Sequence, residues 1–114
     1  MLFTKFRKKR VLKSYLEKLP LLLRKDYGGV GPYTVGQVTN TVERYGLNRE
    51  YVAYACAIFM VKEHFVVAYQ HEPGIAYEDL KQEVADKFFF GNANFSTVDR
   101  GYAAFDSGSG FDSD

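Results

Sequence analysis

The arrangement of the chain follows from residues 48–70, which read NREYVAYACAIFMVKEHFVVAYQ. The first half of this stretch, from Tyr51 to Val61, holds eleven residues without a charge. A surface helix is apolar along one stripe, whereas a helix that is apolar on all sides is buried on all sides. Eleven helical residues rise about 16 Å, roughly half of a bilayer core. We therefore expect a central helix of a soluble domain over residues 49–70.

Length and composition indicate one ordinary globular domain. The chain has 114 residues, of which 46% are hydrophobic and 25% charged, a size and composition typical of a single domain. The only cysteine, Cys56, excludes an intramolecular disulfide and fits a reducing compartment. Charged residues such as Lys13 and Glu17 interrupt the leucine-rich N-terminal segment, so we do not expect a signal peptide. These features predict a cytoplasmic protein.

Periodic apolar residues and local end signals predict the other helices. Leucines recur at helical spacing over residues 4–25, where Pro20 is expected to kink or restart the helix. A capping box and a terminal glycine bound a second helix over residues 35–45. Acidic residues begin a last helix over residues 77–90, which a glycine ends. The residues that give these end signals are Thr34, Gln37, Gly46, Glu78, Asp79 and Gly91.

Two further segments bear on the domain boundaries. Asn48 is expected to cap the central helix, and residues 65–69, which also suit a short strand, are expected to continue it. Residues 92–114 are rich in Gly, Ser and Asp, a composition that favours disorder. The prediction is an all-α domain over residues 1–91, a compact bundle of about four helices around the central buried one. A disordered acidic tail follows over residues 92–114.

Several of these segments together resemble a known family. They are YGGVGPYTVGQV at residues 27–38, GLNREYVAYACAIF at residues 46–59, the turn at Pro73-Gly74 and the Asp/Ser/Gly-rich tail. In this combination the chain resembles a family of short uncharacterised helical proteins from Gram-negative bacteria, a domain of unknown function. The resemblance implies a compact all-helical domain and brings no established activity or functional residues.

The residue types that usually carry chemistry do not form a catalytic, cofactor or metal site in this sequence. His64 and His71 lie two helical turns apart without the further ligands that a metal needs. Cys56 lies among apolar residues, where a reactive thiolate is disfavoured. The glycines of residues 28–31 lack the Gly-Lys-Ser/Thr sequence of a phosphate-binding loop. We therefore predict a protein that is not an enzyme and has no cofactor.

Charge is distributed very unevenly along the chain. Residues 1–25 carry nine Lys or Arg against one Glu, a net +8, whereas the remaining residues carry six against thirteen acids, a net −7. A basic amphipathic segment is typical of contacts with anionic partners. The competing interpretation is that these cations are solvated or pair with the acidic helix at residues 78–86. The predicted partner-binding residues are Lys5, Arg7, Lys8, Lys9, Arg10 and Lys13.

The function expected from these features is binding. We expect a binding or adaptor module for a protein partner that uses the basic N-terminal helix or an exposed aromatic patch, with weak homo-oligomerisation. In the two alternatives the partner is a polyanion, which residues 5–13 would contact. One polyanion is nucleic acid, contacted through its phosphates or by a helix-turn-helix made of the predicted helices at residues 35–45 and 49–70. The other is anionic lipid, with the protein peripheral at the inner membrane surface.

Overall fold

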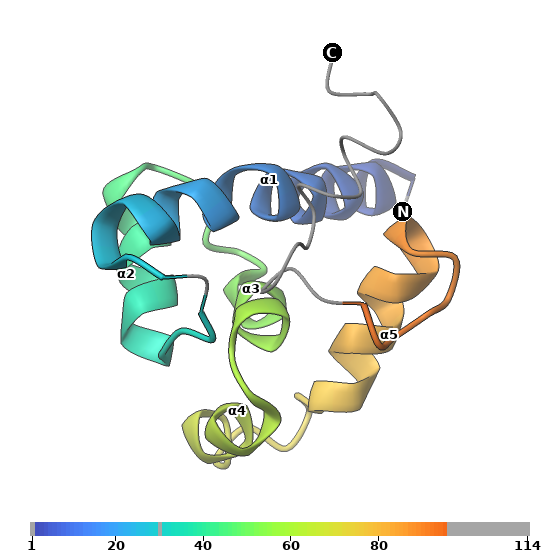
Figure 1. Ribbon diagram of the computed structural model, residues 1–114. Coiled ribbons are helices and arrows are strands. Elements are labelled where there is room, and N and C mark those ends of the chain that lie inside the picture. The colour runs from blue at the N-terminus through green and yellow to red at the C-terminus, as the bar shows by residue number, and fades with distance from the viewer. Residues whose placement is uncertain (1, 30, 96–114) are drawn as a thin grey trace.

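The computed structural model describes residues 2–29 and 31–95, with side chains from Phe6 onward. These residues form five α-helices and no strand, which confirms the predicted all-α class. Figure 1 shows α3 in the middle, α1 along one side, α2 and α5 flanking α3, and α4 at the end opposite α1. The bounds are Leu2–Tyr27 for α1, Val35–Arg44 for α2, Val52–Phe59 for α3, Lys62–Ala68 for α4 and Tyr77–Phe88 for α5.

The core is built around α3, as its uncharged sequence predicts. All residues from Ala55 to Met60 are buried, so α3 has no solvent-facing side in its C-terminal half. The leucines of α1 pack onto it because their helical spacing places them on one face. Phe65 from α4 and Val84 from α5 close the core from the other side. The fully buried α1 side chains are Leu12, Tyr15, Leu16, Leu19 and Leu23.

The prediction that the central helix continues to Gln70 is wrong. The helix ends at Phe59, since Met60 and Val61 have extended backbones with ψ of 157° and 150°, and α4 begins at Lys62. A helix end leaves carbonyl groups without an intrahelical partner. Here the amide of Tyr33, in the α1–α2 loop, donates to the Phe59 carbonyl over 2.9 Å. A tertiary contact therefore stabilises a break between the two helices, and the bundle has five helices instead of about four.

The predicted N-terminal cap of the central helix is also displaced. The helix begins at Val52 and the residue before it, Tyr51, makes no side-chain cap. Asn48 instead closes a local turn, because its Oδ1 accepts a hydrogen bond from the amide of Glu50 at 2.6 Å. Its backbone carbonyl accepts a hydrogen bond from the buried hydroxyl of Tyr15. This residue therefore anchors the α2–α3 connection to α1.

The remaining local predictions are largely confirmed. Thr34 and Gln37 form both hydrogen bonds of the capping box that starts α2, and Gly46 follows α2 with a φ of +68°. Pro20 lies inside α1, which continues to Tyr27, so the helix does not restart there, and the alternative of a kink stays a prediction. The last helix is two residues shorter than predicted and ends at Phe88.

The predicted tail starts too early. Residues 92–95 form a turn that returns toward α5, where the ring of Phe95 stacks on Phe89 with centroids 4.2 Å apart. These residues therefore belong to the folded part, and the disorder predicted for residues 96–114 lies outside the described residues. Among the described helices, none is long and apolar enough to cross a membrane.

Candidate functional site

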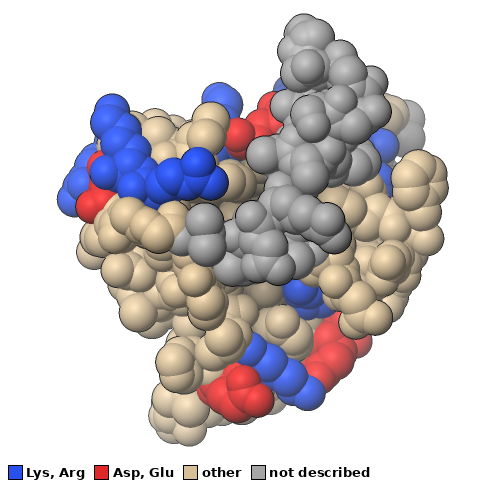
Figure 2. Space-filling view, viewed as in Figure 1, with Lys and Arg blue, Asp and Glu red and all other residues tan. Residues whose placement is uncertain are grey.

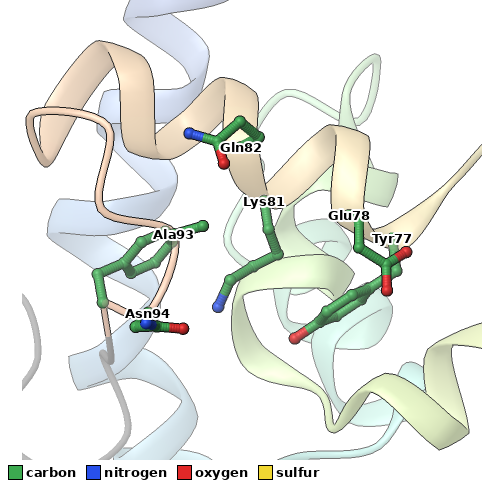
Figure 3. A pocket seen from close by; sticks show the side chains of 7 residues that line it. Tyr77, Glu78, Lys81, Gln82, Ala93 and Asn94 are labelled. Carbon is green, nitrogen blue, oxygen red and sulfur yellow. The ribbon is translucent and has the colours of Figure 1, made fainter.

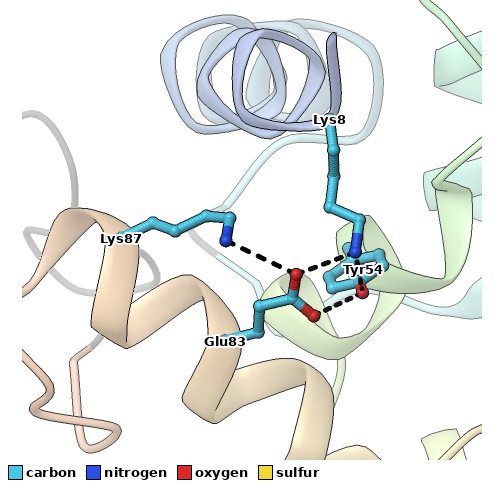
Figure 4. Close-up of polar contacts among 4 residues, drawn as sticks. All are labelled: Lys8, Tyr54, Glu83 and Lys87. Atoms are coloured by element: carbon cyan, nitrogen blue, oxygen red, sulfur yellow. Dashed lines mark hydrogen bonds and ion pairs between the residues drawn. The ribbon is translucent and has the colours of Figure 1, made fainter. Parts of the chain in front are cut away.

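The structure divides the six predicted binding residues into different environments. Lys8 points from α1 inward, toward α3 and α5 (Figure 4). Its Nζ lies 2.8 Å from Oε2 of Glu83 and 3.1 Å from the hydroxyl of Tyr54. Tyr54 donates to the other oxygen of Glu83 at 2.5 Å, and Lys87 approaches the same carboxylate to 3.5 Å. We call Lys8, Tyr54, Glu83 and Lys87 the polar junction.

Partial burial and close pairing shift the pKa values of Lys8, Tyr54 and Glu83 in the polar junction. The hydrogen bond to Glu83 raises the pKa of Lys8 above its ordinary value, outweighing burial. Burial favours a neutral Glu83, but the hydrogen bonds from Lys8 and Tyr54 outweigh it and lower the pKa of this carboxyl group. Burial also raises the pKa of Tyr54. Lys8, Tyr54 and Glu83 therefore keep their ordinary charges at neutral pH, and the junction attaches α1 to α3 and α5.

Four other predicted residues stay at the surface, namely Arg7, Lys9, Arg10 and Lys13. Arg7 pairs with Glu50 at 3.0 Å, and Lys13 approaches Glu17 to 3.9 Å along the helix. Lys9 and Arg10 are exposed and make no ion pair with any residue in the described part of the chain. The side chain of Lys5 lies outside the described residues. Among the five candidates with described side chains, Lys8 alone points inward, and the binding role of the others stays a prediction.

A continuous solvent-facing stripe runs along α1 on the side opposite its buried leucines. Its members are separated by three or four residues, the spacing that places side chains on one helix face. Two of them are apolar and largely exposed, Phe6 at 60% and Leu21 at 63%. We call this stripe the outer face of α1; it consists of Phe6, Arg10, Lys13, Glu17, Leu21 and Arg24.

Positive charge extends along the outer face and beyond it. Arg24, near the C-terminal end of α1, is exposed and has no ion pair within residues 6–29 and 31–95. Lys25 lies over the ring of Tyr45, 5.9 Å from its centroid, and Arg44 pairs with Asp26 at 2.8 Å. Figure 2 shows Lys and Arg side chains gathered at the end of the molecule where α1 meets α2. Like charges held together in this way attract anionic surfaces.

Sequence reasoning missed Leu21 and Arg24 as members of this surface. It assigned Leu21 to neither face of the helix and confined the candidate binding residues to positions 5–13. Counting turns from Arg10 would have found both, because positions 10, 13, 17, 21 and 24 repeat at helical spacing.

Two of the predicted alternatives lose their structural basis. The helix-turn-helix needs a second helix with an exposed polar face, but residues 55–59 of α3 are buried and seven residues separate it from α2. Insertion of the leucine face into a membrane interface conflicts with the complete burial of Leu12, Leu16, Leu19 and Leu23. Contact of the cations alone with phosphates or lipid headgroups does not depend on either feature.

The residues considered for chemistry occupy ordinary positions. Burial raises the pKa of the Cys56 thiol to about 11, and Tyr69 donates a hydrogen bond to its sulfur over 3.6 Å. The burial of Cys56 agrees with its apolar neighbours in the sequence, where a reactive thiolate is disfavoured. His64 and His71 are exposed. Within the described ranges, no three His, Cys, Asp or Glu side chains gather closely enough to hold a metal ion.

The five helices and the cationic outer face define a small all-α domain whose most distinctive surface is one long helix. The chain belongs to a family of unknown function, DUF6559, which matches residues 3–110. No curated protein and no solved structure matches it. The match confirms the resemblance to an uncharacterised family and adds no activity.

Proposed function

We propose that this protein is a non-enzymatic binding module that docks an acidic protein partner on the outer face of α1. The proposal rests on one observation. Over five helical turns, α1 presents cations and two exposed apolar side chains to solvent while its other side is fixed in the core. The proposal keeps the bacterial and cytoplasmic setting expected from the sequence.

The two apolar side chains favour a protein over other anionic partners. Phe6 and Leu21 lie 15 positions apart on α1, so about 22 Å separates them along the helix axis. Arg10 and Lys13 lie between them. Protein interfaces typically combine apolar anchor residues with arginine. A phosphate backbone has no apolar pocket that could bind such anchor residues. An acidic groove on a folded partner would therefore match the outer face along its length.

The rigid attachment of α1 also supports binding. The polar junction and the leucine contacts fix the helix before any partner arrives, so docking requires little ordering of the backbone. Exposed cations chiefly accelerate association, and their effect weakens as salt is added. We therefore expect an association that is fast at low ionic strength and sensitive to salt.

Site-specific photo-crosslinking tests the proposal. A photo-reactive phenylalanine analogue at position 21 is compared with the same analogue at position 67, because Leu21 and Val67 are equally exposed, at 63%. In an extract of the source cells, position 21 should crosslink to a protein whose linked segment, identified by mass spectrometry, is acidic. Position 67 on α4 should not crosslink to that protein. Adding Arg10→Ser and Arg24→Ser should remove the crosslink at position 21.

Other outcomes would contradict the proposal. Equal crosslinking from positions 21 and 67 would mean that the outer face is not selective, and a crosslink to a second copy would show self-association instead. Purified protein is also tested against duplex DNA and anionic vesicles. DNA affinity that falls about 10³-fold between about 50 and 200 mM salt, with no acidic protein crosslinked, would identify a nucleic-acid phosphate binder. Retention on vesicles alone would identify a lipid surface.

A further inference from the structure

A second surface lies on α5, away from the outer face of α1. After α5 ends, the chain reverses through Phe90 and Gly91, which have φ values of +57° and +84°. The returning segment, residues 93–95, lies beside the helix and is held there by the stacking of Phe95 on Phe89. Between the segment and the helix lies a cleft of about 350 Å³ (Figure 3).

One lysine supplies the positive charge of this cleft. Lys81 reaches from α5 into the space between Tyr77 and Asn94 (Figure 3). Its Nζ lies 4.2 Å from the centroid of the Phe95 ring and 5.9 Å from that of Tyr77. Ring faces attract cations and position them without neutralising their charge. The ammonium group is therefore held in place at the cleft.

Lys81 differs from the other partly buried lysines in lacking an acidic partner. Lys8 and Lys87 share the carboxylate of Glu83. Lys81 has no Asp or Glu within ion-pair distance anywhere in residues 6–29 and 31–95, and burial lowers its pKa. Withdrawing an ammonium group from water is unfavourable unless an anion pairs with it. An anion in the cleft would supply the missing partner.

The neighbouring groups restrict the charge and shape of such an anion. The side-chain amide of Asn94 makes no hydrogen bond within the described part of the chain, and it lies beside Lys81 (Figure 3). Glu78, at the edge of the cleft, carries its own negative charge and pairs with Lys62 on its other side. It would repel a second negative charge. The rings of Tyr77 and Phe95 suit an apolar or aromatic body.

We propose that this cleft binds one carboxylate group carried on an aromatic or apolar body, with the Lys81 ammonium and the Asn94 amide donating to its oxygens. The carboxylate belongs either to a free organic acid or to a peptide chain, since both present the same group. This site is separate from the outer face of α1, and neither proposal depends on the other.

NMR titration of the full-length protein with defined probes tests the site. The probes are phenylacetate, its neutral amide, and a short acetylated peptide that ends in phenylalanine with either a free or an amidated C-terminus. Phenylacetate or the free-acid peptide should shift amide resonances of residues 77–82 and 93–95, with a dissociation constant of about a millimolar, as expected for a fragment-sized ligand. The amidated forms should not shift them. Binding of phenylacetate assigns a free acid, and binding of the peptide alone assigns a chain terminus.

Two matched variants decide whether Lys81 is responsible. Lys81→Gln should weaken binding about tenfold or more, because it removes a charge-assisted hydrogen bond. Lys18→Gln removes the same charge from α1 and should leave the affinity unchanged. The proposal is overturned if neither acid shifts these resonances at about 10 mM, a concentration that would saturate a millimolar site. It is also overturned if acid and amide bind alike, or if a folded Lys81→Gln protein binds as the wild type does.

Discussion

The helices α3 and α1 show two different uses of apolar sequence. Five of the eight residues of α3 are buried, and its C-terminal half lies wholly in the core. The 26 residues of α1 bury one face and leave the opposite face cationic and exposed. A helix enclosed on all sides has no surface left for recognition, whereas a helix that covers the core can present a second face. Stability and binding should therefore be separable in this protein by position.

The largest effect is expected at the buried C-terminal end of α3. Phe59 is 1% exposed, so Phe59→Ala should lower the free energy of unfolding by about 3–5 kcal/mol through lost burial and the remaining cavity. Leu21→Ala on the outer face of α1 is the control and should change it by less than about 0.5 kcal/mol. Denaturant unfolding followed by circular dichroism measures both. Similar losses of unfolding free energy for the two variants would show that the core and the outer face of α1 do not differ in their contribution to stability.

An intermediate effect is expected at the polar junction, where the two helices meet. Glu83→Gln should lower the free energy of unfolding by about 1–3 kcal/mol at neutral pH, since two lysines and Tyr54 lose their charged partner. The pKa of Glu83 is lowered in the folded state, so its contribution is complete above the ordinary carboxyl pKa of 4.5. That contribution is lost as pH falls through the folded value.

The pH dependence provides the check on this prediction. The difference in unfolding free energy between wild type and Glu83→Gln should be constant from neutral pH down to about 5 and shrink in more acidic solution. Glu72→Gln, at an exposed residue, serves as the control and should show no such change. A wild-type advantage that stays the same in acid would mean that the ionised carboxylate is not what joins α1 to α3.

The smallest effect on stability is expected on the outer face of α1. Arg10→Ser and Arg24→Ser each remove an exposed cation without an ion pair in the described part of the chain. Each should change the free energy of unfolding by less than about 0.5 kcal/mol. Thermal unfolding at two salt concentrations measures this. A loss above about 1 kcal/mol would give these residues a structural role and weaken the case for a binding face.

Part of the candidate site followed from the sequence alone. The concentration of cations in α1 was apparent from composition, and exposure of Lys9 and Arg10 agrees with it. The competing interpretation, that these cations pair with the acidic helix at residues 78–86, is realised for Lys8. The sequence did not single out Lys8 or its partner Glu83, because the two residues lie 75 positions apart. The Lys81 cleft could not be inferred either, since it forms only where the segment after α5 returns to the helix.

The sequence by itself determined the features that depend on neighbouring residues. Thr34 and Gln37 start α2 and Gly46 follows its end, because caps and left-handed residues act within one helical turn. The uncharged run likewise placed α3 at the centre. Only the tertiary structure decided where α3 ends, because no Gly or Pro marks the break. The α1–α2 loop places the amide of Tyr33 next to Phe59. This amide donates a hydrogen bond to the carbonyl of Phe59 and stabilises the end of the helix at that residue.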